Sequence, residues 1–352
     1  MKELTSRLGI RYPIIQAPMA GVSTPELAAA VTNAGGLGSL AVGHLDMVQA
    51  RRAIAQVRRL TEGPFNVNVF CHRPAERDAM KESEWLSCLT PLFQRFQAEP
   101  PELLREIYRS YVVDRDMQQV LLETRPAVVS FHFGLPESDH IKRLKANGSF
   151  VIANVTNLPE AKLAEQSGVD AIVAQGFEAG GHRGVFNPDA ADEQLPTLKL
   201  TSRLARAIEL PIISAGGVMD ADDVATAMKA GASAVQVGTA FFLCPEVSID
   251  DGYRARIFDA AKRGTAMTRA ISGRPARSIV SEFTTFGESL PAPDCIPAYP
   301  VAYDAGKALK AAAISAGSYE YGATWAGAGV SKCEPIAAAE VVSRLMETTS
   351  DW

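Results

Sequence analysis

The segment Gln175–Gly184 (QGFEAGGHRG) places one histidine among four glycines within ten residues. Glycines carry no Cβ atom, so they let a backbone pass close to a bound molecule. An imidazole titrates near neutral pH, and His182 is therefore suited to take a proton from a substrate. A lone histidine on a core face is more often structural, but His182 stands in a glycine-rich stretch. The segment predicts an active-site loop with His182 as its general base.

Two more glycine-rich phrases follow apolar runs and lead into helical patterns. They are Ser214–Gly217 (SAGG) and Gln236–Thr239 (QVGT). Backbone N–H groups at such places can hold a phosphate. Asn68 and Gln175 end two other apolar runs, where their amides could meet the donors and acceptors of a flat heterocycle. These residues indicate a cofactor with a phosphate and a heterocycle; the alternative is that the glycines only turn the chain.

Eight short apolar runs, with Ala-rich helical patterns between them, must position these residues. The runs are Pro13–Ala17, Gly38–Val42, Phe65–Phe70, Val128–Phe133, Phe150–Val155, Ala171–Gln175, Pro211–Ala215 and Ala234–Val237. Most are apolar on both faces, which is typical of buried parallel strands. Eight right-handed βαβ units close into an α/β (β/α)8 TIM barrel whose functional loops follow the strands. The competing doubly wound sheet usually has a GxGxxG turn after its first strand, and none follows Pro13–Ala17.

Capping residues and terminal glycines mark three of the intervening helices. Helices are predicted over Thr24–Ala34, Asn157–Ser167 and Asp220–Ala230. The first begins with a capping threonine, a first-turn proline and an acidic residue. Each ends in a glycine-containing phrase, where the glycine stops the helix before the next strand.

Two stretches interrupt this alternation and suggest a division of the chain. Residues 72–126 are charged, aromatic and helical in pattern, with Pro100-Pro101 in the middle, and are too long for a βα loop. We interpret them as a helical cap inserted after the third strand. Residues 246–352 form a mostly helical C-terminal covering and substrate region, whose last helix is a candidate for return to the barrel. The barrel itself comprises residues 1–71 and 127–245.

Composition excludes several classes of function. The 352 residues carry 35 basic and 40 acidic side chains, a net charge of −5, which argues against a nucleic-acid partner. No apolar run is long enough to span a membrane, and the N-terminus lacks a signal sequence, so we expect a cytoplasmic protein and no membrane partner. Five cysteines without CxxC spacing predict reduced thiols. His44 and His140 are expected at the surface, and His72 lacks further spaced ligands for a metal.

Several phrases, in this order and spacing, resemble the class I nitronate monooxygenases, formerly called 2-nitropropane dioxygenases. They are YPIIQAPMAGVSTPELAAAVTNAGGLG, FNVNVFCHRP, VVSFHFGLP, AQGFEAGGHRG, SAGGV, VQVGTAF and SGRPAR. The resemblance implies a TIM barrel that binds FMN without a metal and oxidises alkyl nitronates such as propionate 3-nitronate with O2. It implies that His182 is the catalytic base. The flavin contacts that it implies are Ala17, Pro18, Met19, Asn68, Gln175, Gly180, Gly181, Gly216, Gly217, Gln236, Gly238 and Thr239.

The chemistry of such an enzyme suits these residue types. Single-electron transfer from a nitronate to FMN, with O2 trapping the radicals, gives a carbonyl compound plus nitrite or nitrate and needs little acid–base help. A neutral nitroalkane must first lose its α-proton, which is the task predicted for His182. A protonated His182 would also attract a nitronate anion. The expected walls of a small apolar substrate pocket are Met19, Phe70, His132, Phe133 and His182.

One departure and two rival functions accompany the resemblance. The family's usual WAGQ phrase is here Trp325-Ala326-Gly327-Ala328, so any polar contact of that amide is in doubt. The nearer rival is an FMN-dependent NAD(P)H reductase of quinone or enoyl-ACP type on the same scaffold. The other is a TIM barrel that binds a phosphate-bearing ligand without flavin. We expect a small-molecule substrate and O2 as partners, and a homodimer as the assembly if the chain self-associates.

Overall fold

Eight parallel strands form a closed barrel in the computed structural model, which describes residues 2–290 and 293–347. The strands are β1 (Ile14–Gln16), β2 (Gly38–Ala41), β3 (Phe65–Phe70), β4 (Val128–His132), β5 (Phe150–Val155), β6 (Ala171–Gln175), β8 (Ile212–Ala215) and β9 (Ala234–Val237). Their order is β1-β9-β8-β6-β5-β4-β3-β2. A parallel bridge between Ile15 and Leu37 joins the two ends of this order. The predicted (β/α)8 fold is confirmed, and each predicted apolar run contains one barrel strand.

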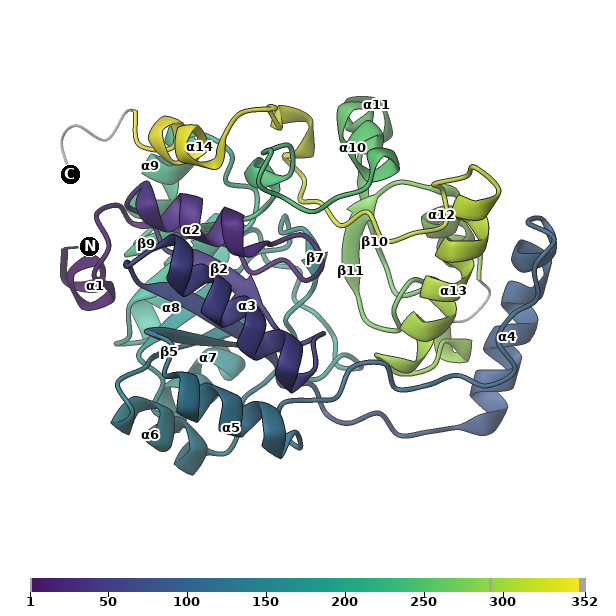
Figure 1. The fold of residues 1–352 in the computed structure, drawn as a ribbon, viewed down its shortest axis with the longest axis horizontal. Helices are drawn as coiled ribbons and strands as arrows, with labels where there is room; N and C mark the ends of the chain where they lie inside the picture. The colour runs from purple at the N-terminus through teal and green to yellow at the C-terminus, as the bar shows by residue number, and fades with distance from the viewer. Residues whose placement is uncertain (1, 291–292, 348–352) are drawn as a thin grey trace.

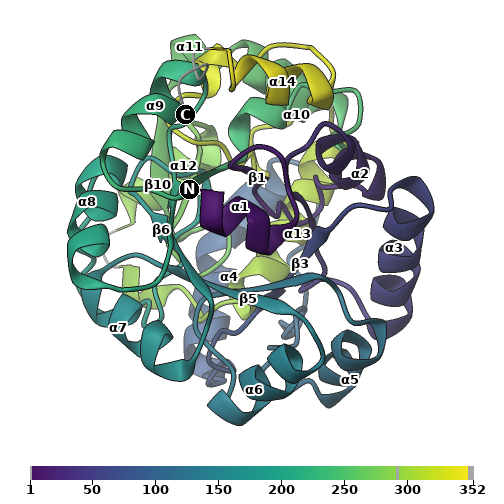
Figure 2. The ribbon, with the colours of Figure 1, turned by 90° about the vertical axis from the view of Figure 1, so that its left-hand side faces the viewer.

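A ring of helices surrounds the barrel (Figure 2). It consists of α2 (Pro25–Asn33), α3 (Met47–Leu60), α5 (Arg115–Thr124), α6 (Ser138–Ala146), α7 (Leu158–Ser167), α8 (Thr197–Ala207), α9 (Ala221–Lys229) and α14 (Ala338–Arg344). The short helix α1 (Lys2–Leu8) lies across the N-terminal end of the strands, where Leu4 and Leu8 join the apolar cluster inside the barrel. The barrel is therefore closed at this end, and a ligand must enter at the other.

The predicted helix caps are present. Thr24, Asn157 and Asp220 each accept a hydrogen bond from the backbone N–H three residues on, which begins α2, α7 and α9. Gly168 ends α7 with φ of +88°, a left-handed conformation that glycine adopts without strain.

A second group of elements lies beyond the C-terminal ends of the strands, on the right in Figure 1. It contains α4 (Ala79–Gln94), α12 (Glu282–Ser289), α13 (Val301–Ser315) and the short turn η2 (Pro293–Cys295). The remaining elements are α10 (Asp251–Phe258), α11 (Ala260–Arg263) and the short turns η1 (Thr239–Phe241) and η3 (Val330–Lys332), and η1 packs in the same apolar core as α2 and α14. Trp85, Leu89 and Phe93 of α4 share an apolar core with Ala305 and Leu309 of α13. This core is separate from those that join the barrel strands to their helices.

A small antiparallel sheet connects this group to the barrel and was not predicted. Strands β10 (Thr265–Thr268) and β11 (Ala276–Ile279) pair with each other, and β11 pairs with β7 (Gly181–His182). The sequence gives little sign of these strands because they have at most four residues and stand among glycines and prolines. These strands matter for the site because their pairing fixes the backbone of His182.

The segment after β3 is only partly helical. The helical pattern that follows Pro100-Pro101 becomes a helix only at Arg115, and that helix, α5, contacts α3 and α6 in the outer ring. The helix α14 near the C-terminus contacts α2. Our division of the chain at residues 72–126 and 246–352 stays a proposal.

No helix in the described residues is long and apolar enough to cross a membrane. Within residues 2–290 and 293–347, no disulfide joins the cysteines, and His, Cys, Asp and Glu side chains form no group of three that could hold a metal ion.

Candidate active site

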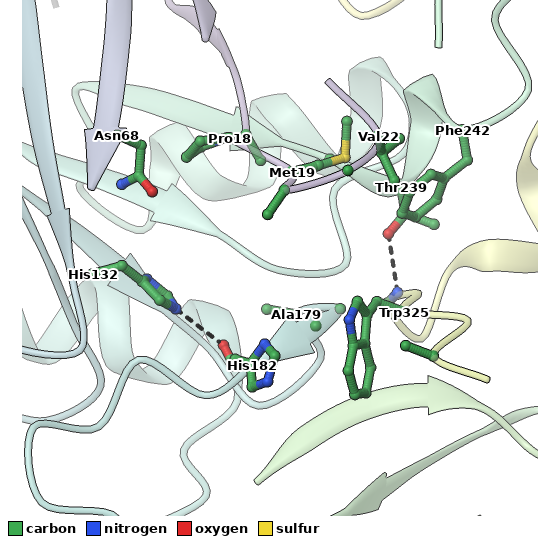
Figure 3. A pocket seen from close by; sticks show the side chains of 18 of the residues that line it. Pro18, Met19, Val22, Asn68, His132, Ala179, His182, Thr239, Phe242 and Trp325 are labelled. Carbon is green, nitrogen blue, oxygen red and sulfur yellow. Dashed lines mark hydrogen bonds between the residues drawn. The ribbon is translucent and has the colours of Figure 1, made fainter. Parts of the chain in front are cut away.

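The loops that follow the barrel strands enclose a cavity of about 370 Å³. Every residue predicted for the cofactor and for the substrate pocket lines it. These residues are Ala17, Pro18, Met19, Asn68, Phe70, His132, Phe133, Gln175, Gly180, Gly181, His182, Gly216, Gly217, Gln236, Gly238 and Thr239. They come from six barrel strands or the loops after them. In Figure 3, Pro18 and Met19 lie across the open space from Ala179 and His182.

The backbone of His182 is fixed from two sides. β7 pairs with β11, so that His182 lies opposite Ala276. The carbonyl oxygen of His182 accepts hydrogen bonds from Nε2 of Gln175 at 3.0 Å and from Nε2 of His132 at 3.3 Å. Figure 3 shows the second of these contacts. Because a carbonyl can only accept, His132 carries its proton on Nε2.

The glycine-rich loop itself is held rigidly. Arg183 is buried, forms a bidentate ion pair with Asp192 at 2.8 and 2.9 Å, and donates to the carbonyl of Gln175 at 2.9 Å. The side-chain oxygen of Gln175 accepts from the N–H of Gly184 at 2.7 Å. A Cβ atom at Gly184 would collide with Asn154. The contacts of the Gln175 amide are therefore largely structural, whatever else it binds.

Four aromatic side chains surround the imidazole of His182. Ring centroids lie at 4.9 Å for Trp325, 5.3 Å for Tyr299, 5.6 Å for Phe133 and 6.0 Å for Tyr303. Tyr303 comes from the first turn of α13, Tyr299 from the turn just before that helix, and Trp325 from the segment between α13 and η3. The elements beyond the barrel therefore complete the wall around His182.

This environment keeps the histidines of the site neutral. Burial, and then the nearby His132 and Arg274, lower the pKa of His182 well below its usual 6.5. Burial and the Arg274 guanidinium lower the pKa of His132 to about 3. Arg274 is itself buried 4.3 Å from the centroid of the Phe133 ring, and no carboxylate of the described residues pairs with it. The low pKa of His182 disfavours the protonated form that we considered for attracting an anion.

Two amides offer polar atoms to a ligand in the cavity. The side-chain nitrogen of Asn68 donates to the backbone oxygen and the hydroxyl of Ser130, at 3.1 and 2.9 Å. The side-chain oxygen of Asn68 has no partner in the described chain, and neither has the side chain of Gln236. Asn68 stands at the end of β3 and Gln236 in β9, so these atoms can bond a heterocycle from two sides.

The loops after β8 and β9 provide the side of the cavity suited to a phosphate. Gly216 and Gly217 have φ of +121° and +75°, values at which side chains are strained. A Cβ atom at Gly216 would lie 2.9 Å from the backbone nitrogen of Ala179. The hydroxyl of Thr239 accepts from the N–H of Gly327 at 3.0 Å, the second dashed contact in Figure 3. This hydrogen bond connects the loop after β9 to the segment between α13 and η3 that contains Trp325.

Sequence reasoning missed the residues that α13 contributes. Tyr303 and Lys307 lie four residues apart on α13, the spacing of one helix face, and both line the cavity together with Tyr299 from the turn before the helix. The spacing indicates a common helix face, but no residue nearby in the sequence indicates that this face contacts the barrel. Ser272, whose hydroxyl lies 2.9 Å from Nε2 of His182, was missed for the same reason.

Two histidines lie elsewhere than predicted. His140 is buried in α6, with its Nε2 2.6 Å from the Tyr111 hydroxyl. His44 is half-buried and lines the cavity beside Tyr108, with ring centroids 6.3 Å apart. The expectation of surface positions was wrong. His44 meets Tyr108 of the 72–126 segment, whose path the sequence does not reveal, whereas His140 shares the buried face of α6 with Ile141 and Leu144. Burial lowers the pKa of each to about 4.

The departure from the family's WAGQ phrase falls at the edge of the site. Ala328 is exposed and does not belong to the cavity lining, whereas Gly327 and Gly329 on either side of it do. The N–H of Ala328 donates to the carbonyl of Glu178 at 2.9 Å.

Comparisons with known proteins assign the family. The sequence profile of the nitronate monooxygenases matches residues 2–348. The chain belongs to this family. A nitronate monooxygenase of Paraburkholderia phytofirmans is 55% identical over 98% of this chain and 94% of the relative, and one of Pseudomonas aeruginosa is 48% identical over 97% of each. This chain is thus a flavin-dependent oxidoreductase of the nitronate monooxygenase family, and the family resemblance seen in the sequence is confirmed.

Solved structures support the same fold. A nitroalkane oxidase of Streptomyces ansochromogenes superposes with a TM-score of 0.88 at 35% identity, covering 97% of this chain and 96% of the other. FabK of Thermotoga maritima superposes with a TM-score of 0.75 at 28% identity, covering 98% and 94%. Members of the nitronate monooxygenase family oxidise nitronates, and the finer assignment for this chain is argued next.

Proposed function

We propose that this nitronate monooxygenase uses FMN to oxidise alkyl nitronates with O2, giving a carbonyl compound with nitrite or nitrate. Propionate 3-nitronate is the substrate we favour, and His182 serves as base when the substrate is a neutral nitroalkane. The observation that carries the proposal is the position of His182, whose imidazole has a lowered pKa and faces a cavity lined by the amides of Asn68 and Gln236 and by the glycines after β8 and β9.

The residues of the cavity fit FMN. Asn68 and Gln236 offer amide groups to the ring system, and Gly216, Gly217, Gly238 and Thr239 form a side-chain-poor surface for the phosphate. Bound FMN would supply the electron-transfer chemistry between the nitronate and O2. The protein supplies placement, an apolar enclosure and control of the substrate's proton.

The substrate side of the cavity combines an aromatic wall with a cation. The rings around His182 would hold a short alkyl chain. Lys307 lines the same cavity, with its Nζ 4.8 Å from the Tyr108 ring centroid and 5.6 Å from that of Tyr303. No carboxylate of the described residues forms an ion pair with Lys307, and the neighbouring Asp304 pairs with Arg105. This free cation supports a substrate with a carboxylate at the end away from the nitronate.

His182 can act on a neutral nitroalkane without first losing a proton. Its pKa is lowered, so the imidazole is unprotonated at neutral pH and has a lone pair to accept the α-proton. The electron pair of the broken C–H bond moves into the C=N bond of the nitronate, and the nitro oxygens take the negative charge. A substrate that arrives as a nitronate needs no such step.

Anaerobic mixing of the purified protein tests the proposal. We expect propionate 3-nitronate to bleach the flavin absorbance rapidly and NADPH to leave it unchanged on the same timescale. Rapid bleaching by NADPH but not by the nitronate would replace the proposal with the reductase alternative. If the purified protein is colourless and binds no added FMN, the alternative of a flavin-free barrel that binds a phosphate-bearing ligand would replace the proposal.

A further inference from the structure

A buried serine contacts the imidazole of His182 from outside the cavity. Ser272 has no exposed surface, and its Oγ lies 2.9 Å from Nε2 of His182. It belongs to the phrase SGRPAR, which neither the cofactor nor the substrate explains. The same phrase also holds the neighbouring backbone, since the N–H of Arg183 donates to the carbonyl of Pro275 at 2.8 Å. Ser272 does not line the cavity, so its effect on chemistry must pass through His182.

The neighbours of the Ser272 hydroxyl determine its direction. A serine oxygen donates one hydrogen and accepts at two lone pairs. Besides His182, Ser272 Oγ lies 3.3 Å from the carbonyl oxygen of Arg274 and 3.4 Å from the backbone nitrogen of Arg274. The carbonyl can only accept and the N–H can only donate. Ser272 therefore satisfies all three neighbours only if it donates to the carbonyl and accepts from the other two.

We propose that Ser272 is a positioning residue that holds the proton of neutral His182 on Nε2 and leaves the lone pair on Nδ1. In the opposite tautomer, Ser272 would donate to Nε2, and the Arg274 carbonyl would lose its hydrogen bond from the hydroxyl. The hydrogen bond on one imidazole nitrogen decides which nitrogen is protonated. Ser272 thus selects the nitrogen that can act as a base.

The remaining nitrogen is free for the substrate. Nδ1 of His182 has no hydrogen-bond partner among the described residues, and His182 lines the cavity. Trp325, Tyr299 and Phe133 pack around the ring and restrict its rotation. Resting on the proposed function, Nδ1 would take the α-proton of a neutral nitroalkane, while Nε2–H continues to donate to Ser272. The imidazolium that forms then carries one proton on each nitrogen.

The tautomer can be measured directly on the full-length flavoprotein. Histidine labelled with ¹⁵N gives two-bond ¹H–¹⁵N correlations that distinguish Nε2–H from Nδ1–H imidazoles, and the chain has only five histidines. The spectrum of the His182→Asn variant identifies the His182 signals. We expect the Nε2–H form in the wild type at pH 7.5. A wild-type Nδ1–H form overturns the inference, and this measurement needs no Ser272 variant to fold.

Ser272→Ala and a matched control extend the test to catalysis. Ser278 is an equally buried serine on β11 whose hydroxyl donates to the carbonyl of Thr324 at 2.9 Å, away from His182. In Ser272→Ala we expect a mixture of tautomers and a fall of about 10-fold in kcat for a neutral nitroalkane, with KM and nitronate turnover changed less than about twofold. Ser278→Ala should keep the wild-type tautomer and the wild-type ratio of the two activities.

The outcomes separate this inference from the proposed function. If Ser272→Ala keeps both the wild-type tautomer and the wild-type nitroalkane kcat, Ser272 does not position His182. If the wild type has the Nε2–H tautomer and loses it in Ser272→Ala, the positioning role holds even for a protein that oxidises no nitronate. In that case the proposed function fails and the inference stands.

Discussion

Replacing Lys307 by methionine tests whether the cavity recognises a carboxylate. The substitution removes the charge and leaves an unbranched side chain that is one atom shorter. Two unit charges about 4 Å apart interact by about 1 kcal/mol in water and about 4 kcal/mol at an effective dielectric constant of about 20. Lys307 is exposed at the cavity rim, so we take the lower half of this range, about 1–2 kcal/mol. The expected loss is about 5- to 30-fold in kcat/KM for propionate 3-nitronate.

The assay compares two nitronates and two lysines. Nitronate-dependent oxygen consumption is measured with propionate 3-nitronate and with butyl nitronate, which ends in a methyl group instead of a carboxylate. Butyl nitronate should change less than about twofold in Lys307→Met, and the loss with propionate 3-nitronate should shrink as salt screens the charges. Lys332→Met is the control, because Lys332 lies outside the cavity lining and pairs with Asp220 at 2.8 Å. Equal losses for both nitronates would refute the argument from charge.

Three further predictions concern the base, the cofactor and pH. His182→Asn should lower kcat/KM for a neutral nitroalkane by about 10²- to 10⁴-fold and leave most of the nitronate activity, and an equal loss on both would contradict the base role. Gly217→Ala, at φ +75°, should weaken FMN binding at least about 10-fold in a fluorescence titration. The control Gly168→Ala, at φ +88° but away from the cavity, should lower the melting temperature and leave FMN binding unchanged. Burial lowers the pKa of His72 to about 3 and that of His140 to about 4, so below the unfolded pKa near 6.5 each of them gains a proton on unfolding. Chemical denaturation should therefore show the free energy of unfolding falling by about 1 kcal/mol per histidine between pH 7.5 and pH 5.5. An unfolding free energy that does not change over this range would exclude the linkage.

The sequence predicts the barrel and its functional end because the signals for both are local. Buried parallel strands are short apolar runs, and the residues just after them must lie at one end of a barrel. Asn68, Gln236 and the glycine pair at 216 and 217 could therefore be assigned to one site without knowledge of contacts. All of them line the same cavity in the structure.

The rest of the site depends on contacts between distant segments. Ser272 reaches His182 across 90 residues, and Tyr299, Tyr303 and Trp325 lie more than 100 residues after it. Their approach requires β11 to pair with β7 and α13 to pack against α4, and neither pairing has a local signature. The prediction for His140 failed for another reason. His140 shares the buried face of α6 with Ile141 and Leu144, and the spacing of these residues was visible in the sequence.

The electrostatics of the cavity assign different tasks to its basic groups. Arg274, buried without a carboxylate partner, opposes protonation of His182 and so keeps the imidazole able to accept a proton. A neutral base cannot also attract an anionic substrate, so attraction must come from a group that stays charged. On the proposed function, Lys307 at the rim meets that need, because it is exposed and forms no ion pair with a carboxylate of the described residues. On the proposed function, the enzyme takes a nitronate directly and also ionises a neutral nitroalkane, and Lys307→Met and His182→Asn should impair these two abilities separately.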